Sequence, residues 1–198
     1  QDKDGKVVES WTSETSPHRI NRIKAGTYTL IETKAPKGYK KAKPIKCTVV
    51  NTTSYVQLFN MGDTKYVDIT ISKFINRKEV VPQHGTPTFI FKVEGTDLDG
   101  DSHTYYRCVS FDNIPESGTY IPLTTVISAP AGKYTISEVE TSRYNVENIE
   151  GAVSADIRSG VSIVDTSTNS PANVNYYNKK STDEHLTDTD VVVNHVVG

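Results

Sequence analysis

Three polar residues each end a run in which apolar and polar side chains alternate. Because residues two apart share one face of an extended strand, Lys73, Glu138 and Asn178 each lie on the apolar face of their run. The runs are VDITISK at 67–73, YTISE at 134–138 and VNYYN at 174–178. One amine, one carboxyl group and one carboxamide are therefore expected to point into a core. The alternative is that each residue is the last of its strand and already emerges into solvent.

Buried together, these three groups could react. Burial lowers the pKa of a lysine and raises that of a glutamic acid, so Lys73 and Glu138 could share one proton as a neutral amine and a neutral acid. A neutral amine is a nucleophile, and a carboxamide whose oxygen accepts a hydrogen bond from an acid is an acyl donor. We expect an amide bond between Lys73 and Asn178, formed once per molecule with loss of ammonia. Glu138 would first donate a hydrogen bond and then carry the proton.

The elements that must position these groups are strands. Alternating runs recur along the chain between turns that contain glycine, and helical periodicity is hard to find. The pattern G-x-Y-T-[LI]-x-E occurs at 26–32 and again at 132–138, and each copy is followed by an alternating run that ends in asparagine, at 56–60 and 174–178. The sequence therefore predicts an all-β fold made of two tandem antiparallel β-sandwiches.

A short polar stretch at 61–65 separates the two copies. We expect one domain at 1–63 and a larger one at 64–181. Residues 182–198 are expected to be a tail or linker, in which the valines at 191–193 could add a strand.

Composition argues against several classes of function. The formal net charge is −2, which gives no basic surface for nucleic acid or for anionic lipid. No apolar run approaches the roughly 18 residues that a membrane span requires. The five histidines are scattered singly, and no Ser-His-Asp arrangement or nucleophile elbow is present. We therefore expect no nucleic-acid partner, no membrane span, no cofactor and no enzyme that turns over.

Two further signals have plain interpretations. Cys47 and Cys108 show no CxxC spacing, so neither a zinc site nor a disulfide framework is indicated, and we expect two buried, inert thiols. The run 97–101 (DLDGD) lacks the residue order and the closing Glu of a calcium loop. It is expected to be a hairpin turn, and no metal site is predicted.

The stretch GTYTLIETKAPKGY at 26–39 resembles the E-box strand and following loop of Cna protein B-type (prealbumin-like) domains, which form isopeptide bonds in pilins and surface adhesins of Gram-positive bacteria. The resemblance covers 1–60 and extends less closely to the second copy, which has longer insertions. In that family a Lys on the first strand and an Asn on the last strand form an intramolecular isopeptide bond with help from the E-box Glu. By position, the resemblance implies these roles for Lys73, Asn178 and Glu138.

The first copy departs from this pattern. Glu32 and Asn60 match the family's Glu and Asn, but no lysine is well placed to be their partner, because the family's Lys lies upstream of the hairpin that opens this chain. We expect a Cna B-type domain that lacks its first strand, which has been removed or is supplied by another chain. Such a domain would offer a free edge to a strand donor in trans.

The resemblance implies a structural stalk or pilin-like module of a cell-surface adhesin, extracellular and either anchored to the cell wall or associated with a pilus. Its partners would be neighbouring domains of the same surface protein. One alternative is a module that binds a carbohydrate or host protein through exposed tyrosines and the long insertions. Another is an accessory β-sandwich of a secreted enzyme, without any isopeptide bond.

Overall fold

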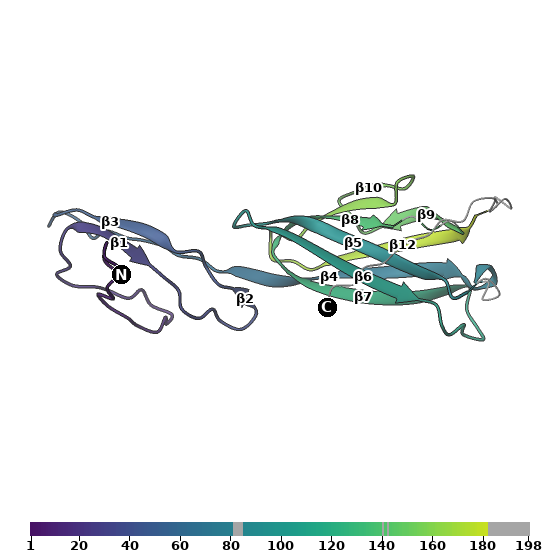
Figure 1. The fold of residues 1–198 in the computed structure, drawn as a ribbon, viewed down its shortest axis with the longest axis horizontal. Coiled ribbons are helices and arrows are strands. Elements are labelled where there is room, and N and C mark those ends of the chain that lie inside the picture. Colours follow the sequence, from purple (N-terminus) through teal and green to yellow (C-terminus); the bar gives the residue numbers. More distant parts are fainter. Residues whose placement is uncertain (81–84, 140, 142, 182–198) are drawn as a thin grey trace. The chain divides into compact units, whose positions relative to one another are not determined.

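The computed structural model describes residues 1–80, 85–139, 141 and 143–181 (Figure 1). In these residues the fold is all-β, as predicted, with one short 3-10 helix, η1, at Arg77–Glu79. The chain divides into two compact units, Gln1–Lys65 and Tyr66–Gly198, where the sequence suggested a boundary after residue 63. The expectations for the tail at 182–198 lie outside the described residues.

The second unit contains two sheets. The first has the order β10-β11-β8-β5-β6, and all of its neighbouring strands are antiparallel. Its strands are β5 (Thr88–Asp97), β6 (Ser102–Ser110), β8 (Gly132–Glu138), β10 (Ser154–Asp156) and β11 (Val161–Asp165). In the other sheet β4 lies between β7 and β12, and β9 pairs with the far edge of β12. Its strands are β4 (Thr64–Asn76), β7 (Tyr120–Pro130), β9 (Tyr144–Glu150) and β12 (Ala172–Lys180).

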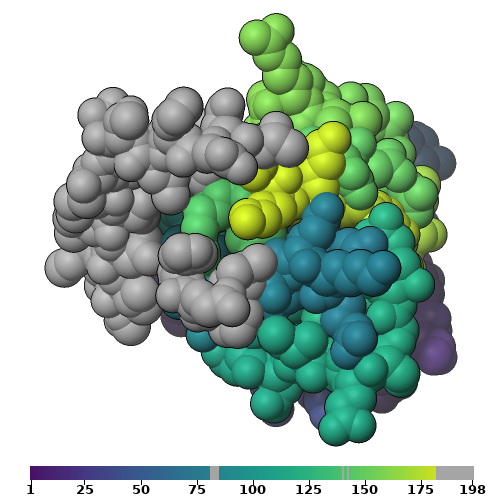
Figure 2. Space-filling model, turned by 90° about the vertical axis from the view of Figure 1, so that its right-hand side faces the viewer, coloured from purple at the N-terminus to yellow at the C-terminus, as the bar shows by residue number. Residues whose placement is uncertain are grey.

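One strand pair departs from the antiparallel pattern. β4 and β12, the first and last strands of the second unit, are parallel and pair from Ala172–Ile69 to Asn178–Ile75. Parallel neighbours need a crossover connection instead of a hairpin, and here the chain between them passes through the opposite sheet. Figure 2 looks onto the end of this unit, where the last residues of β4 (blue) and β12 (yellow) lie side by side.

The core of the second unit lies between its two sheets. Along β4 the burial alternates, with Val67, Ile69, Ile71 and Ile75 buried and Asp68 exposed. The opposite sheet supplies aromatic and aliphatic side chains that are fully buried, among them Phe89, Phe91, Val93 and Ile136. Removing this apolar surface from water is the main stabilising contribution to such a sandwich.

The first unit contains far less sheet. β1 (Gly26–Leu30) and β3 (Ile45–Val49) form an antiparallel pair, and β2 (Tyr39–Lys40) pairs with the start of β4 at Thr64 and Lys65. Among residues 1–65, all of which are described, only three residues are buried: Ala42, Cys47 and Thr64. Large apolar side chains are exposed instead: Val7, Val8, Trp11, Val50, Tyr55, Val56, Leu58 and Phe59.

Two expectations from the sequence were wrong. The run 56–60 is not a strand, because the side-chain amide of Gln57 makes the hydrogen bonds to the backbone N–H and C=O of Val50 that a strand neighbour would make. Cys108 is exposed, unlike the buried Cys47. Its thiol lies on the outward-facing side of β6, which also carries the exposed Tyr106. The face of the strand, and not the residue type, therefore decides the exposure of Cys108.

Candidate functional site

The three polar side chains singled out from the sequence meet in the core of the second unit. Lys73 is on β4 and Asn178 on the neighbouring β12, while Glu138 ends β8 in the opposite sheet. Lys73 pairs in register with Tyr176, two residues before Asn178, so the lysine and the asparagine lie on the same face of adjacent strands.

Glu138 bridges the other two residues. Its Oε2 lies 2.6 Å from the Nζ atom of Lys73, and its Oε1 accepts a hydrogen bond of 2.5 Å from the Nδ2 atom of Asn178. Lys73 and Asn178 are 0% exposed and Glu138 is 8% exposed. The alternative of strand ends that emerge into solvent is therefore wrong for these residues, because the sandwich closes over them.

The amine of Lys73 is surrounded by aromatic rings. Its Nζ atom lies 4.5 Å from the centre of the Phe89 ring, 6.0 Å from that of Phe91 and 5.9 Å from that of Tyr176. Burial lowers the pKa of Lys73 from 10.5 to about 8, although the charge of Glu138 and its hydrogen bond act in the opposite direction. The neutral, nucleophilic amine is therefore far more accessible here than on a surface lysine.

The carboxamide of Asn178 forms a hydrogen bond through its nitrogen but not through its oxygen among the described residues. Its Oδ1 atom is buried and has no hydrogen-bond partner among the described residues. A buried acceptor without a partner costs about 1 to 3 kcal/mol. A half-turn of the carboxamide would place Oδ1 against Glu138, where a protonated carboxyl group could donate to it. That hydrogen bond would polarise the carbonyl carbon toward attack by an amine.

Tyr176 holds the strand that carries Asn178 against the opposite sheet. Its hydroxyl donates to the backbone oxygen of Ile136 at 3.0 Å and lies 2.6 Å from the Oγ atom of Ser162. Burial raises the pKa of Tyr176, so the phenol stays protonated. From the sequence, Tyr176 was placed on one face with Asn178 and Phe89 was noted only as part of a strand. Neither was given a role at the site, although their alternation with polar neighbours was the signal that could have placed them there.

In the first unit the equivalent residues do not meet. One carboxylate oxygen of Glu32 accepts a hydrogen bond of 2.8 Å from the backbone N–H of Ala42. Asn60 is exposed and lies outside any strand. The Glu and the Asn named from the sequence are thus both present, but the described unit does not assemble them into a buried site.

Two other features of the second unit have the residue types of a site, an acidic cluster and a small cavity. The carboxylates of Asp97, Asp99 and Asp101 come within 4.8 Å of one another, but the Oδ1 atom of Asp97 accepts hydrogen bonds from the backbone N–H groups of Asp99 and Asp101. These bonds cap the β5–β6 hairpin turn that the sequence predicted.

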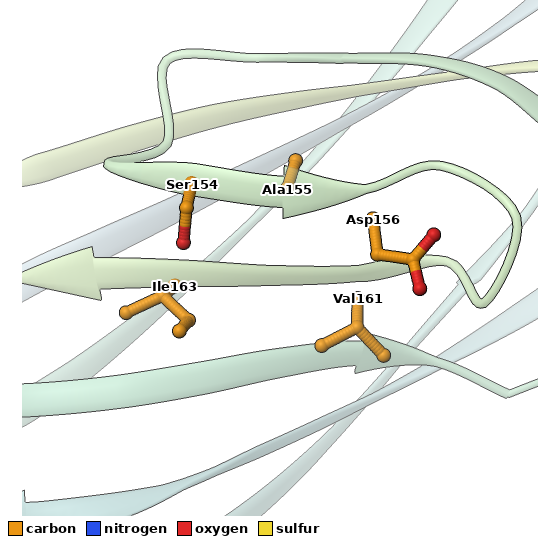
Figure 3. Close-up of a pocket in the computed structure, with 5 residues that line it drawn as sticks. All are labelled: Ser154, Ala155, Asp156, Val161 and Ile163. Carbon is orange, nitrogen blue, oxygen red and sulfur yellow. The ribbon is translucent and has the colours of Figure 1, made fainter.

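A cavity of about 210 Å³ lies beside β10 and β11, and Figure 3 shows the side chains that line it. It is lined by Ser154, Ala155, Asp156, Val161 and Ile163. Sites for small molecules usually measure about 300 to 1,000 Å³, so this shallow cavity is small for a ligand site.

Comparison with known proteins identifies a family model that resembles the first unit. The model of the SpaA family, described as a prealbumin-like fold domain, matches residues 1–65. Domains of this kind are found in pilins and other surface proteins of Gram-positive bacteria. The match supports the prealbumin-like family for the first unit, without specifying the Cna B type. Neither the curated proteins nor the solved structures contain a match to the chain.

In the described residues no helix is long and apolar enough to cross a membrane.

Proposed function

We propose that this chain is a structural stalk or pilin-like module of a Gram-positive surface adhesin, and that Lys73 and Asn178 of its second unit join in an isopeptide bond. The observation that carries the proposal is the position of Glu138, which contacts both reacting side chains in the buried core. The prealbumin-like match at residues 1–65 supports an extracellular location, on the cell wall or on a pilus. It also supports the presence of further domains in the same surface protein.

The reaction is an exchange of amides. The neutral Nζ atom of Lys73 attacks Cγ of Asn178, while protonated Glu138 donates a hydrogen bond to Oδ1. The Nζ–Cγ bond forms, the Cγ–Nδ2 bond breaks, and Glu138 passes the proton from Nζ to the leaving nitrogen, which departs as ammonia. Fixed proximity in a rigid core replaces the high concentration of amine that this exchange would need in water. The reaction happens once in each chain, so the protein is not a turnover enzyme.

The bond would join the first and last strands of the second unit. A crosslink that closes a loop of about 100 residues contributes roughly 4.7 kcal/mol in the chain-entropy model. Because the link is not a disulfide, it does not depend on redox conditions. A pull on the two ends of the unit would run through a covalent bond and bypass most of the hydrogen bonds between strands.

The mass of the intact protein tests the proposal. Folded wild-type chain should weigh less than its sequence by one ammonia molecule, whereas Glu138→Gln should keep the full mass. Glu94→Gln is the matched control, since Glu94 pairs with Lys92 at the same 2.6 Å distance on the surface. The Glu94→Gln chain should lose ammonia as the wild type does. A wild-type chain of full mass would refute the bond, and loss of ammonia from Glu138→Gln at the normal rate would refute the role of Glu138.

A second candidate function is binding of a carbohydrate or a host protein. It is favoured by a cluster of aromatic rings on the outer face of the β4-containing sheet, where Phe74 stacks on Tyr177 at 4.7 Å and Tyr120 meets Tyr177 edge-on at 5.8 Å. Tyr120 is exposed, and exposed aromatic residues are enriched at binding interfaces. Saturable binding to immobilised glycans or matrix proteins, lost in Tyr120→Ala, would support this function. Stalk and binding roles are compatible.

A further inference from the structure

The short helix η1 follows the strand that carries Lys73 and contacts the strand that carries Asn178. We infer that Glu79, the last residue of η1, is a positioning residue of the isopeptide site. Its carboxylate holds the end of β12, so that Asn178 stays against Glu138. The inference rests on the isopeptide bond proposed above and adds a residue that does not itself take part in the chemistry.

The ladder between β4 and β12 ends at the reacting asparagine. Asn178 and Ile75 form its last pair, and β4 itself ends at Asn76. On the other edge of β12, the register with β9 shifts between Tyr177 and Asn178. Asn178 therefore lies where the β4 ladder stops and the β9 ladder is irregular, and such strand ends open locally more easily than the middle of a sheet.

Glu79 supplies a hydrogen bond just beyond this point. Its Oε2 atom accepts from the backbone N–H of Lys180 at 3.1 Å, two residues after Asn178. In the parallel register of β4 and β12, residue 77 would lie opposite Lys180, but there the chain has already turned into η1. The carboxylate thus provides an acceptor in place of the backbone that a longer β4 would have offered.

The helix that carries this carboxylate is itself held firmly. The backbone N–H of Arg77 donates to the oxygen of Thr119, just before β7, at 2.8 Å. The backbone oxygen of Glu79 accepts from the hydroxyl of Tyr144 on β9 at 3.0 Å. Val80, the next residue, is buried in the core. The side chain of Glu79 therefore extends to β12 from a fixed point.

Glu79 is also connected to the aromatic rings around the amine. The ring of Tyr144 packs edge-on against Phe89, with the ring centres 5.4 Å apart, and the Nζ atom of Lys73 lies 4.5 Å from the centre of the Phe89 ring. The backbone of Glu79 thus supports the lysine side of the site, and its side chain supports the asparagine side. Because substitution removes only the side-chain contact, variants of Glu79 test the position of Asn178.

The rate of ammonia loss after refolding, followed by intact mass, tests the inference. The chains are compared at a temperature at which circular dichroism shows them folded. Glu79→Ala removes the acceptor and should slow the loss by about tenfold, because a displacement of about 1 Å at a reacting group can lower a rate by about a hundredfold. Glu79→Gln keeps an oxygen acceptor at the same reach. It should stay within about threefold of the wild type, since neutral hydrogen bonds are weaker than charged ones.

Glu79→Asp keeps the inference testable if the alanine variant does not fold. It retains the charge but shortens the side chain by one methylene group, so its carboxylate falls short of the N–H of Lys180. We expect slower ammonia loss in Glu79→Asp than in Glu79→Gln. The reverse order would mean that the charge matters and the reach does not, and would overturn the inference.

Glu150→Ala is the matched control. Glu150 lies on β9 in the same sheet, and its carboxylate accepts from side chains, the hydroxyl of Tyr177 at 3.1 Å and the amide of Asn148 at 3.0 Å. Glu150→Ala should lose ammonia at the wild-type rate. If the wild type loses ammonia, an unchanged rate in Glu79→Ala, or equal slowing in Glu79→Ala and Glu150→Ala, would overturn this inference alone. A wild-type chain of full mass would refute the isopeptide bond together with the inference.

Discussion

Glu138 is the residue on which the proposed chemistry of the second unit depends. One of its carboxylate oxygens contacts the amine of Lys73, and the other contacts the carboxamide of Asn178. The three groups are hidden from water, and a buried charge is tolerated only when it is paired. Proton transfer is therefore expected between Lys73 and Glu138, and not between either residue and solvent.

The pH dependence of bond formation follows from the pKa of Lys73, which burial lowers to about 8. Below that pH the Lys73–Glu138 pair holds one shared proton, and the reactive form, a neutral amine beside a neutral acid, holds the same proton. Above about pH 8 the pair loses this proton, so the fraction of the reactive form falls about tenfold per pH unit. The rate of ammonia loss during refolding, followed by mass at each pH, should show this profile.

The opposite profile would identify a different role for the carboxylate. If the neutral amine alone were sufficient, the rate would rise with pH up to about 8 and then stay level. That result would exclude Glu138 as the acid of the reaction.

At the scale of elements, β12 is held by its two strand neighbours and by one contact across the core. It pairs with β4 along one edge and with β9 along the other, and its Tyr176 hydroxyl reaches across the core to Ser162 and to the backbone of Ile136. This contact across the core fixes the distance between β12 and β8. It thereby also fixes the distance between the side chains of Asn178 and Glu138.

Tyr176→Phe should weaken this positioning. The change removes one hydroxyl and leaves the buried Ser162 hydroxyl without that partner, at a cost of about 1 to 3 kcal/mol in the free energy of unfolding. Ammonia loss should also be slower. Tyr177→Phe is the control, because the Tyr177 hydroxyl contacts Glu150 on the surface and its loss should change stability by about 0.5 kcal/mol or less. Denaturant unfolding and mass measurements check both effects, and equal results for the two variants would contradict the positioning role.

The alternation of side chains was enough to predict which face of β4, β8 and β12 enters the core, because a period of two fixes the face once a strand exists. It was not enough for the run 56–60, where apolar and polar residues also alternate. A strand needs a neighbour's backbone, and that neighbour cannot be read from the run itself. The parallel pairing of β4 with β12 was missed for a related reason, since strand order depends on contacts distant in the sequence.

At the scale of the molecule, the proposed bond would divide the second unit into a short load-bearing path and a long protected loop. The path runs along β4 to Lys73 and leaves through Asn178, close to the end of β12 at Lys180. Everything between the two residues would carry no tension. The parallel direction of β4 and β12 makes this path possible, because the two strands are pulled in opposite directions along their shared ladder.

Single-molecule stretching can measure the length of the protected loop. Lys73→Met cannot form the bond, so unfolding of its second unit should release the 105 residue steps from 73 to 178, about 350 to 380 Å of extended chain. The wild type should lack this extension. An identical unfolding length in both proteins would show that the bond does not carry the load. Lys92→Met, which changes a half-buried lysine outside the site, should behave as the wild type.

The place of Asn178 on β12, the last strand of the unit, also sets the order of events during biogenesis. A ribosome makes the N-terminal part first, so the asparagine emerges long after the lysine and the glutamate are available. The surface location proposed above would require export of the chain, which would stay linear in an export channel until Asn178 had emerged. It would become a closed covalent ring only on the far side, where it can no longer pass back.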